Sequence, residues 1–163
     1  MLRVRHRVAV RESGKGMIRT LKIRAAGPAD VQAISKVLHK CGLPSGGVEP
    51  SVRLYHVAVL GDNVIGCACG EQFDETVVVH TVAVLQDYRD QQVATHLVGA
   101  LLMRARANGC TKATLLTAEH PSFFARYGFT LTSVDVIPKQ VKLTRKFQRR
   151  FGARTHCMCR RLD

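Results

Sequence analysis

The stretch HTVAVLQDYRDQQVATHLVGALL, residues 80–102, has the residue types and spacing best suited to chemistry. A hydrophobic strand runs into a short polar turn and then directly into a helix, whose first turn leaves backbone N–H groups unpaired. Those groups and the helix dipole favour an anion. Arg89 lies in the turn and Thr95 offers a hydroxyl near the helix start. The pattern predicts a diphosphate site without a Walker lysine, since the chain has no GxxxxGK[ST] motif.

Side chains that could move a proton lie on the strands before this helix. Glu71 follows a stretch rich in Cys and Gly, where a lone carboxylate is unusual unless it faces a cavity. The alternative is a solvated carboxylate at a sheet edge. His80, on the next strand, is either a base that faces a ligand or a histidine satisfied in the core. Two further base candidates lie in a later loop, Glu119 and His120, and two histidines are expected at the surface, His56 and His96.

The elements that must position these residues follow from hydrophobic periodicity and turn residues. A helix is expected to open at Pro28 and close at Cys41-Gly42, and two more are expected at 93–108 and 121–126. Residues 139–150 form a candidate last helix. The predicted strands are 21–25, 55–60, 64–73, 77–84, 112–117 and 129–137. This is a mixed α/β (α+β) fold in the order β-α-β-β-β-α-β-α-β, an antiparallel meander that feeds a strand–helix–strand crossover.

The formal charge of +13 comes from the two ends of the chain. Residues 1–24 hold eight Lys or Arg and residues 139–163 hold nine, whereas residues 25–138 carry two more acidic than basic residues. Nucleic-acid binders usually carry a basic stripe interleaved with stacking aromatics, and this chain has no Trp. We therefore expect solvated tails and no nucleic-acid partner. No stretch approaches the roughly 20 apolar residues that cross a bilayer, so no membrane partner is expected.

A length of 163 residues suits one domain. We expect residues 1–16 to be a disordered basic extension and residues 17–163 to be a single domain with a basic C-terminal segment at 139–163. The extension fits a transit peptide, an expression remnant or translation from upstream of Met17. Of the six cysteines, Cys41, Cys67, Cys69 and Cys110 are expected to be reduced thiols in the cytoplasm, with Cys67 and Cys69 on one face of a strand. The tail Cys157 and Cys159 are a weak metal signal, and no metal is expected.

The ordered motifs resemble the GNAT superfamily of N-acetyltransferases over roughly residues 20–137. The V-x-V strand end of the family matches Val82-Ala83-Val84, and its R/Q-x-x-G-x-G/A loop matches Arg89 to Ala94. A strand and a short helix ending in a GF pair, FFARYGF at 123–129, follow as in the family. The stretch GCACGEQFDETVVVHTVAV, the FFARYGF signature and the tail pattern of Pro138, Phe147 and Cys157-Met158 look closest to one branch. It contains the acetyltransferase domain of N-acetylglutamate synthases and the arsenic-resistance-associated acetyltransferases.

The resemblance implies acetyl-CoA as the cofactor and assigns roles by position. Backbone N–H groups of Val82 and Val84 would hold the pantetheine arm and polarise the thioester carbonyl. Amides from Gln92 to Thr95, assisted by Arg89, would bind the pyrophosphate. The full expected cofactor set is Val82, Ala83, Val84, Arg89, Gln91, Gln92, Val93, Ala94, Thr95 and Phe124. The expected catalytic set is Glu71, His80 and Tyr127.

Three positions depart from the family pattern. Gln92 stands where the family usually has glycine, and it fits there if its φ is negative. Phe124 replaces a proton-donating Tyr that many members use; Tyr127 and Ser122 are nearby substitutes, although packing suits Tyr127 better. His80 stands where this branch typically has an Arg that grips a substrate carboxylate, which weakens an amino-acid assignment.

The sequence therefore predicts an enzyme that moves acetyl from acetyl-CoA to the amine of a small, amino-acid-like molecule, with Glu71 or an ordered water as the base. One alternative is a peptide or protein N-acetyltransferase. Another is a catalytically degenerate acyl-CoA-binding interaction module, which Gln92 and Phe124 motivate. Since GNAT domains often pair, a homodimer is a further expectation.

Overall fold

The computed structural model describes residues 7–11, 18–117, 120–142 and 155–163. These residues divide into two compact units, each treated on its own. The first contains residues 1–70 and 81–103, and the second contains residues 71–80 and 104–163. The strand order in the sheet is β1-β2-β3-β4-β5-β6-β8-β7. The predicted mixed α/β fold is confirmed.

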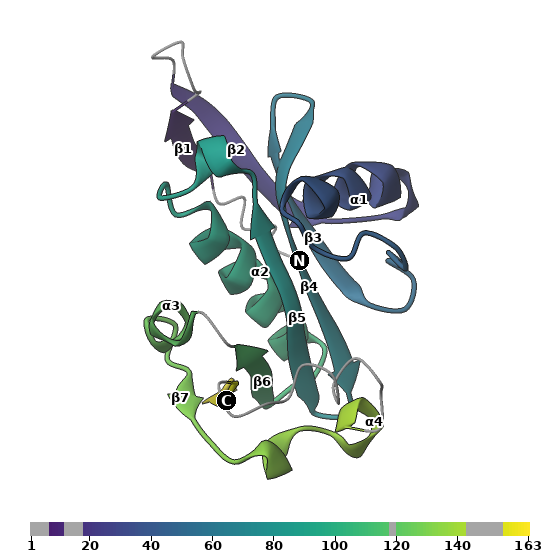
Figure 1. Ribbon diagram of the computed structural model, residues 1–163, viewed down its shortest axis with the longest axis vertical. Coiled ribbons are helices and arrows are strands. Elements are labelled where there is room, and N and C mark those ends of the chain that lie inside the picture. Colours follow the sequence, from purple (N-terminus) through teal and green to yellow (C-terminus); the bar gives the residue numbers. More distant parts are fainter. Residues whose placement is uncertain (1–6, 12–17, 118–119, 143–154) are drawn as a thin grey trace. The chain divides into compact units, whose positions relative to one another are not determined.

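Antiparallel strands form the first unit, with α1 and most of α2 (Figure 1). Val57 of β3 lies opposite Cys67 of β4, and the tight turn between these strands uses Gly61 at a φ of +60°. Leu21 of β2 lies opposite Leu60 of β3. The elements of this unit are β1 (Arg7–Arg11), β2 (Ile18–Ala25), η1 (Pro28–Asp30), α1 (Val31–Lys40), β3 (Leu54–Leu60), β4 (Asn63–Phe73), the end of β5 (Thr76–Val84), η2 (Gln86–Tyr88) and α2 (Val93–Ala107).

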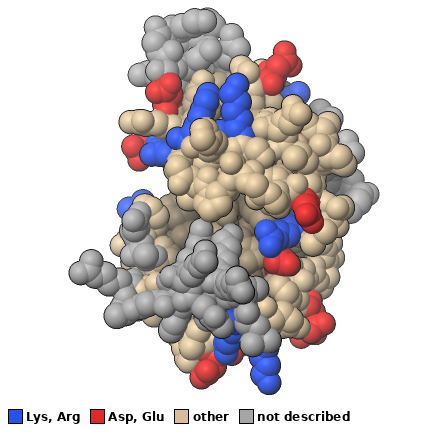
Figure 2. Space-filling model, turned by 45° about the vertical axis from the view of Figure 1, so that its right-hand side comes forward, with Lys and Arg blue, Asp and Glu red and all other residues tan. Residues whose placement is uncertain are grey.

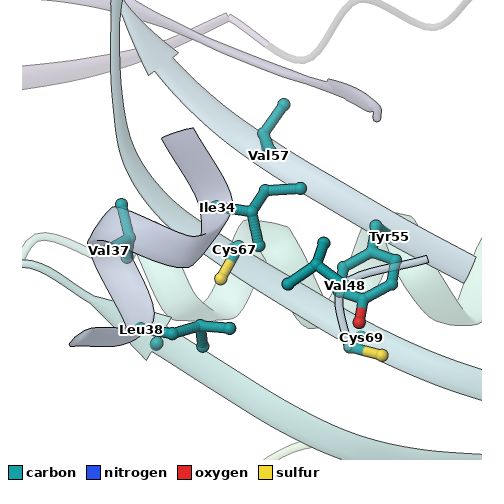
Figure 3. Close-up of a cluster of buried hydrophobic side chains, with 9 residues drawn as sticks. Ile34, Val37, Leu38, Val48, Tyr55, Val57, Cys67 and Cys69 are labelled. Carbon is teal, nitrogen blue, oxygen red and sulfur yellow. The ribbon is translucent and has the colours of Figure 1, made fainter. Parts of the chain in front are cut away.

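The two helices of the first unit pack on opposite faces of β4. Cys67 and Cys69 share a buried cluster with the apolar stripe of α1, as the period-two alternation predicted (Figure 3). Gly66 faces the other way: a Cβ at this position would lie 3.1 Å from Leu97 of α2 and 3.0 Å from the Ala83 carbonyl oxygen. Only glycine therefore lets α2 and β5 approach β4 this closely. The cluster drawn in Figure 3 comprises Ile34, Val37, Leu38, Val48, Tyr55, Val57, Cys67 and Cys69 with Ala83.

The second unit is built on β6 (Lys112–Thr117), which pairs in parallel with β5 and antiparallel with β8 (His156–Arg161). The short β7 (Thr130–Leu131) pairs with the other side of β8. The helical elements of this unit are α3 (Pro121–Ala125), η3 (Val134–Val136) and α4 (Lys139–Lys142). Its buried cluster contains Val78, Ile137, Val141 and Cys157.

Three sequence predictions need correction. Residues 7–11, expected in a disordered extension, form β1, because the alternating RVAVR pairs with Ile18–Lys22 of β2. The strand expected at 129–137 is limited to β7, because the Ser133 hydroxyl accepts a hydrogen bond from the Asp135 amide and opens η3. The C-terminal segment was expected to be solvated, yet β8 pairs along the whole of β6. The candidate helix at 139–150 begins as α4, and residues 143–150 lie outside the described part.

Lys and Arg side chains lie among Asp and Glu side chains on the face drawn in Figure 2. Within the described residues, no group of three or more His, Cys, Asp or Glu side chains could hold a metal ion. No helix in this part of the chain has both the length and the apolar character needed to cross a bilayer. The expectations about nucleic acid and dimerisation stay predictions.

Candidate functional site

The loop between β5 and α2 has an unusual backbone conformation and leads directly into the first turn of α2. Asp90 and Gln92 both adopt left-handed backbone conformations, with φ values of +62° and +65°. The Gln92 carbonyl accepts the His96 amide at 3.1 Å, which starts the helix. Buried Val93, 1% exposed, anchors the first turn in the core. The amides of this turn have no partner within the helix, so the loop and the helix start together can take a phosphate group.

Gln92 therefore occupies the conformation that a glycine would favour. The condition under which Gln92 was expected to fit, a negative φ, is not met. Its side chain is exposed, so the backbone keeps the left-handed shape without burying the amide. The neighbouring expected cofactor residues Gln91, Ala94 and Thr95 are half-buried. Gln92 thus takes up the left-handed conformation of a glycine at the cost of backbone strain.

Arg89 links this loop to the end of β5 by a hydrogen bond. Its Nε donates to the Val84 carbonyl oxygen at 2.9 Å, and its guanidinium NH2 lies 3.9 Å from Cys41 Sγ. The Cys41 thiol also donates to the Val84 carbonyl, at 3.6 Å. The Arg89 side chain is nevertheless exposed, so its guanidinium contacts the end of β5 on one side and solvent on the other. Sequence reasoning missed Cys41, because 48 residues separate it from Arg89 and no local signal links them.

The V-x-V segment forms the end of β5. Ala83 and Val84 are buried at 4% and 8% exposure, and Val82 is half-buried. The Leu85 amide donates to the Ile65 carbonyl at 2.9 Å and continues the strand contact just past Val84. Burial and this hydrogen bond thus fix the position of the segment against β4 where the loop begins.

Glu71 and His80, flagged separately from sequence, are in direct contact. Glu71 Oε2 lies 3.0 Å from His80 Nε2. The side chains are 22% and 16% exposed, so water reaches both but surrounds neither. They come from the β4 and β5 halves of one hairpin, whose turn is closed by Asp74 at a φ of +53°. A carboxylate and an imidazole in such contact form a pair suited to acid–base chemistry.

Tyr127 belongs to an aromatic cluster around the GF pair. Its ring centroid lies 5.2 Å from that of Phe123, which in turn meets Phe124 edge-on at 4.9 Å. Phe124 also packs against buried Phe129 at 5.9 Å, and Gly128 makes the turn at a φ of +80°. These contacts give Tyr127 and Phe124 a packing role, and the proposed catalytic and cofactor roles stay predictions.

The other histidines and carboxylates singled out from sequence have varied surroundings. His120 lies at the exposed start of α3, where its amide donates to the Thr117 hydroxyl at 3.1 Å, and Glu119 is outside the described residues. His96 is half-buried, and His56 is buried at 5% exposure in β3, so its expected surface position is wrong. The six cysteines are free thiols. Burial raises the pKa of Cys67 to about 12 and also raises the pKa values of Cys157 and Cys159, so burial favours the neutral thiol at these three positions.

Two proteins with curated names are similar in sequence to part of this chain. An amino-acid acetyltransferase of Shewanella oneidensis is 32% identical over 94 residues, which are 53% of this chain and 20% of that protein. An amino-acid acetyltransferase of Mannheimia succiniciproducens is 28% identical over 139 residues, 78% of this chain and 31% of that protein. The chain thus spans about a fifth to a third of the length of these relatives.

Solved structures show the same fold. N-acetylglutamate synthase from Neisseria gonorrhoeae, complexed with coenzyme A and N-acetyl-glutamate, matches 88% of this chain and 35% of its own at a TM-score of 0.70 and 23% identity. Rv2747 from Mycobacterium tuberculosis, in complex with CoA and NLQ, matches 84% of this chain and 96% of its own at a TM-score of 0.70 and 21% identity. The profile of the acetyltransferase (GNAT) family matches residues 36–129, more than half of the chain. This protein belongs to the acetyltransferase (GNAT) family.

Proposed function

We propose that this protein is an N-acetyltransferase that moves the acetyl group of acetyl-CoA to the amine of a small, amino-acid-like molecule. The observation that carries the proposal is the left-handed loop at Asp90 and Gln92, which opens α2 in a chain of the GNAT family. The relatives named as amino-acid acetyltransferases, and the synthase structure with coenzyme A and N-acetyl-glutamate, support the cofactor and the amino-acid-like acceptor.

Acetyl-CoA supplies a thioester carbonyl that an amine can attack. The amides of Gln92 to Thr95, assisted by the exposed guanidinium of Arg89, would bind its pyrophosphate. The backbone of Val82 to Val84 would orient the pantetheine arm and polarise the thioester carbonyl. Glu71 or an ordered water would act as the base, and the 3.0 Å contact of Glu71 Oε2 with His80 Nε2 supports an acid–base role for this pair.

Calorimetry with acetyl-CoA in moderate salt tests the cofactor assignment. Wild-type protein is expected to bind in the micromolar range, a free energy of about −8 kcal/mol. Arg89→Ala is expected to weaken binding, because it removes a cation and loosens the loop from Val84. Arg106→Ala is the matched control, since Arg106 is an exposed arginine in the last turn of α2. Equal affinities of wild-type protein and Arg89→Ala would contradict the assignment.

Turnover on a panel of amines tests the activity. Release of the coenzyme A thiol is followed with amino acids, simple amines and short peptides as acceptors. Faster turnover with amino acids supports the proposed substrate class, and faster turnover with peptides supports a peptide acetyltransferase. Tight acetyl-CoA binding without turnover on any amine would favour the acyl-CoA-binding module instead.

The remaining assignments are part of the same proposal. We place the protein in the cytoplasm, with no nucleic-acid or membrane partner, and we expect a homodimer. Light scattering at several concentrations tests the dimer: a monomer mass throughout would refute it. Association with DNA or RNA that weakens steeply with salt would contradict the proposed absence of a nucleic-acid partner.

A further inference from the structure

We infer that Cys41, at the end of α1, is a positioning residue that holds the guanidinium of Arg89 for the pyrophosphate of acetyl-CoA. The inference rests on the proposed cofactor site and deepens it. Its basis is a three-way contact at the end of β5. The Val84 carbonyl oxygen accepts from Arg89 Nε at 2.9 Å and from Cys41 Sγ at 3.6 Å. Arg89 Nη2 in turn donates to Cys41 Sγ at 3.9 Å, and all three residues belong to the first unit.

The end of α1 fixes the place of the Cys41 side chain. The Gly42 amide donates to the His39 carbonyl at 3.0 Å, and the Leu43 amide donates to the Leu38 carbonyl at 2.9 Å. This pair of bonds, with Gly42 at a φ of +71°, is a Schellman motif in which Cys41 is the C-cap. Cys41 also packs against the buried cluster drawn in Figure 3. Helix end and cluster together keep Sγ beside the end of β5.

The contact prepares Arg89 for an anion. An arginine that moves freely in the unliganded protein loses rotamer freedom when it grips a phosphate, and this loss weakens binding. Val84 and Cys41 hold the guanidinium before any ligand arrives. They take up two of the five N–H donors of a guanidinium, and the exposed side chain can offer the others to a phosphate oxygen. Cys41 thus lowers the cost of ordering Arg89.

The thiol holds only one end of the guanidinium. Its S–H donates to the Val84 carbonyl, and its sulfur accepts from Arg89 Nη2. The bond from Arg89 Nε to the Val84 carbonyl does not depend on the thiol, so the arginine would stay attached to β5 without Cys41. Loss of the thiol should therefore weaken acetyl-CoA binding less than loss of Arg89 itself.

A double-mutant cycle on acetyl-CoA binding, measured by calorimetry, tests the inference. Cys41→Ala is expected to weaken binding about three- to tenfold, the effect of about one hydrogen bond. In an Arg89→Ala background the same change is expected to weaken it less than about twofold, because the arginine that Cys41 positions is gone. Cys67→Ala is the matched control, since it removes a buried thiol from the same cluster. It should lower Tm and leave affinity within about twofold of wild type.

Two further readouts separate positioning from folding. In turnover assays, Cys41→Ala should raise the KM for acetyl-CoA about as much as it weakens binding and leave kcat within about twofold, because the phosphates are held alike before and during the reaction. Cys41→Ser keeps a group that donates and accepts, so it should bind acetyl-CoA more tightly than Cys41→Ala. Thermal unfolding checks that each variant is folded, and Cys41→Val replaces Cys41→Ala if that variant does not fold.

Several results would overturn the inference. An equal loss of affinity from Cys41→Ala in both backgrounds would mean that the thiol acts independently of Arg89. Wild-type affinity in Cys41→Ala, a lower kcat with an unchanged KM, or Cys41→Ser binding no more tightly than Cys41→Ala would also contradict it. With tight binding by wild type and weaker binding by Arg89→Ala, these results leave the acetyl-CoA assignment standing. Wild-type protein that does not bind acetyl-CoA would overturn both the assignment and this inference.

Discussion

Replacing Gln92 by glycine is expected to stabilise the protein, although the residue lies in the proposed phosphate-binding loop. Gln92 has a φ of +65°, a conformation that costs an L-residue with a Cβ about 1–2 kcal/mol. Glycine adopts it without that cost. Glycine also gains conformational freedom in the unfolded chain, which lowers stability by about 0.4–1 kcal/mol. The difference predicts a net gain of about 0.5–1 kcal/mol for Gln92→Gly.

The gain can be measured by thermal and urea unfolding. For a chain of this size, 1 kcal/mol shifts Tm by about 2–4 °C, so we expect a rise of about 1–4 °C. The exposed Gln92 side chain makes lost packing a small term. Gln91→Gly is the matched control, because Gln91 is not among the residues with positive φ and should lose about 0.5–1 kcal/mol. The prediction holds only if Gln92→Gly raises the free energy of unfolding and Gln91→Gly lowers it.

A destabilised Gln92→Gly protein would refute this reasoning, because it would mean that the Gln92 side chain contributes more than its backbone strain removes. Acetyl-CoA calorimetry on the same variant adds a second readout. Since the backbone already has the left-handed shape, removing the side chain should leave affinity unchanged or raise it. A loss of affinity in a stabilised protein would show that the Gln92 amide itself binds the ligand.

Three further predictions concern stability and thiol reactivity. The bidentate contact of Arg24 with Asp30, 2.8 Å at each oxygen, holds the pKa of Asp30 at about 2. Because that pKa is lowered, the stabilisation is complete above about pH 4 and is lost as the pH falls toward 2. Asp30→Asn should therefore lower the free energy of unfolding in urea by about 1–2 kcal/mol at pH 7 and by much less at pH 2.5. An equal loss at both pH values would contradict the role of the ion pair. Gly128→Ala should lower the free energy of unfolding by about 1 kcal/mol in thermal unfolding, because the φ of +80° strains a residue with a Cβ. The nearest atom to the new Cβ lies 3.6 Å away, so no clash adds to this cost. An unchanged stability would exclude the left-handed turn. At pH 8, iodoacetamide should label half-buried Cys41 well before buried Cys67, whose pKa is raised to about 12. Peptide mass spectrometry after labelling of the native protein measures the order, and earlier labelling of Cys67 would contradict the prediction.

Local patterns in the sequence determined most elements of the fold. Residues 112–117 form the predicted strand, and the apolar stripe between Val31 and Leu38 faces the core as expected, because period and burial are local properties. The β3–β4 hairpin follows from the turn residues around Gly61. The chemistry of Glu71 and His80 was also readable, since a carboxylate and an imidazole on expected strands are unusual wherever they occur.

Tertiary structure decided the contacts that give these residues their roles. The HCMCRR segment of β8 lacks a clear strand pattern and becomes a strand because β6, about 40 residues earlier, satisfies its backbone hydrogen bonds. The 3.0 Å contact between Glu71 and His80 depends on hairpin register, and a shift of one residue would send one side chain to the opposite face. The positive φ of Gln92 and the contact of Arg89 with Cys41 likewise follow from how the chain closes on itself. Pairing and register join residues distant in sequence, so no local period encodes them.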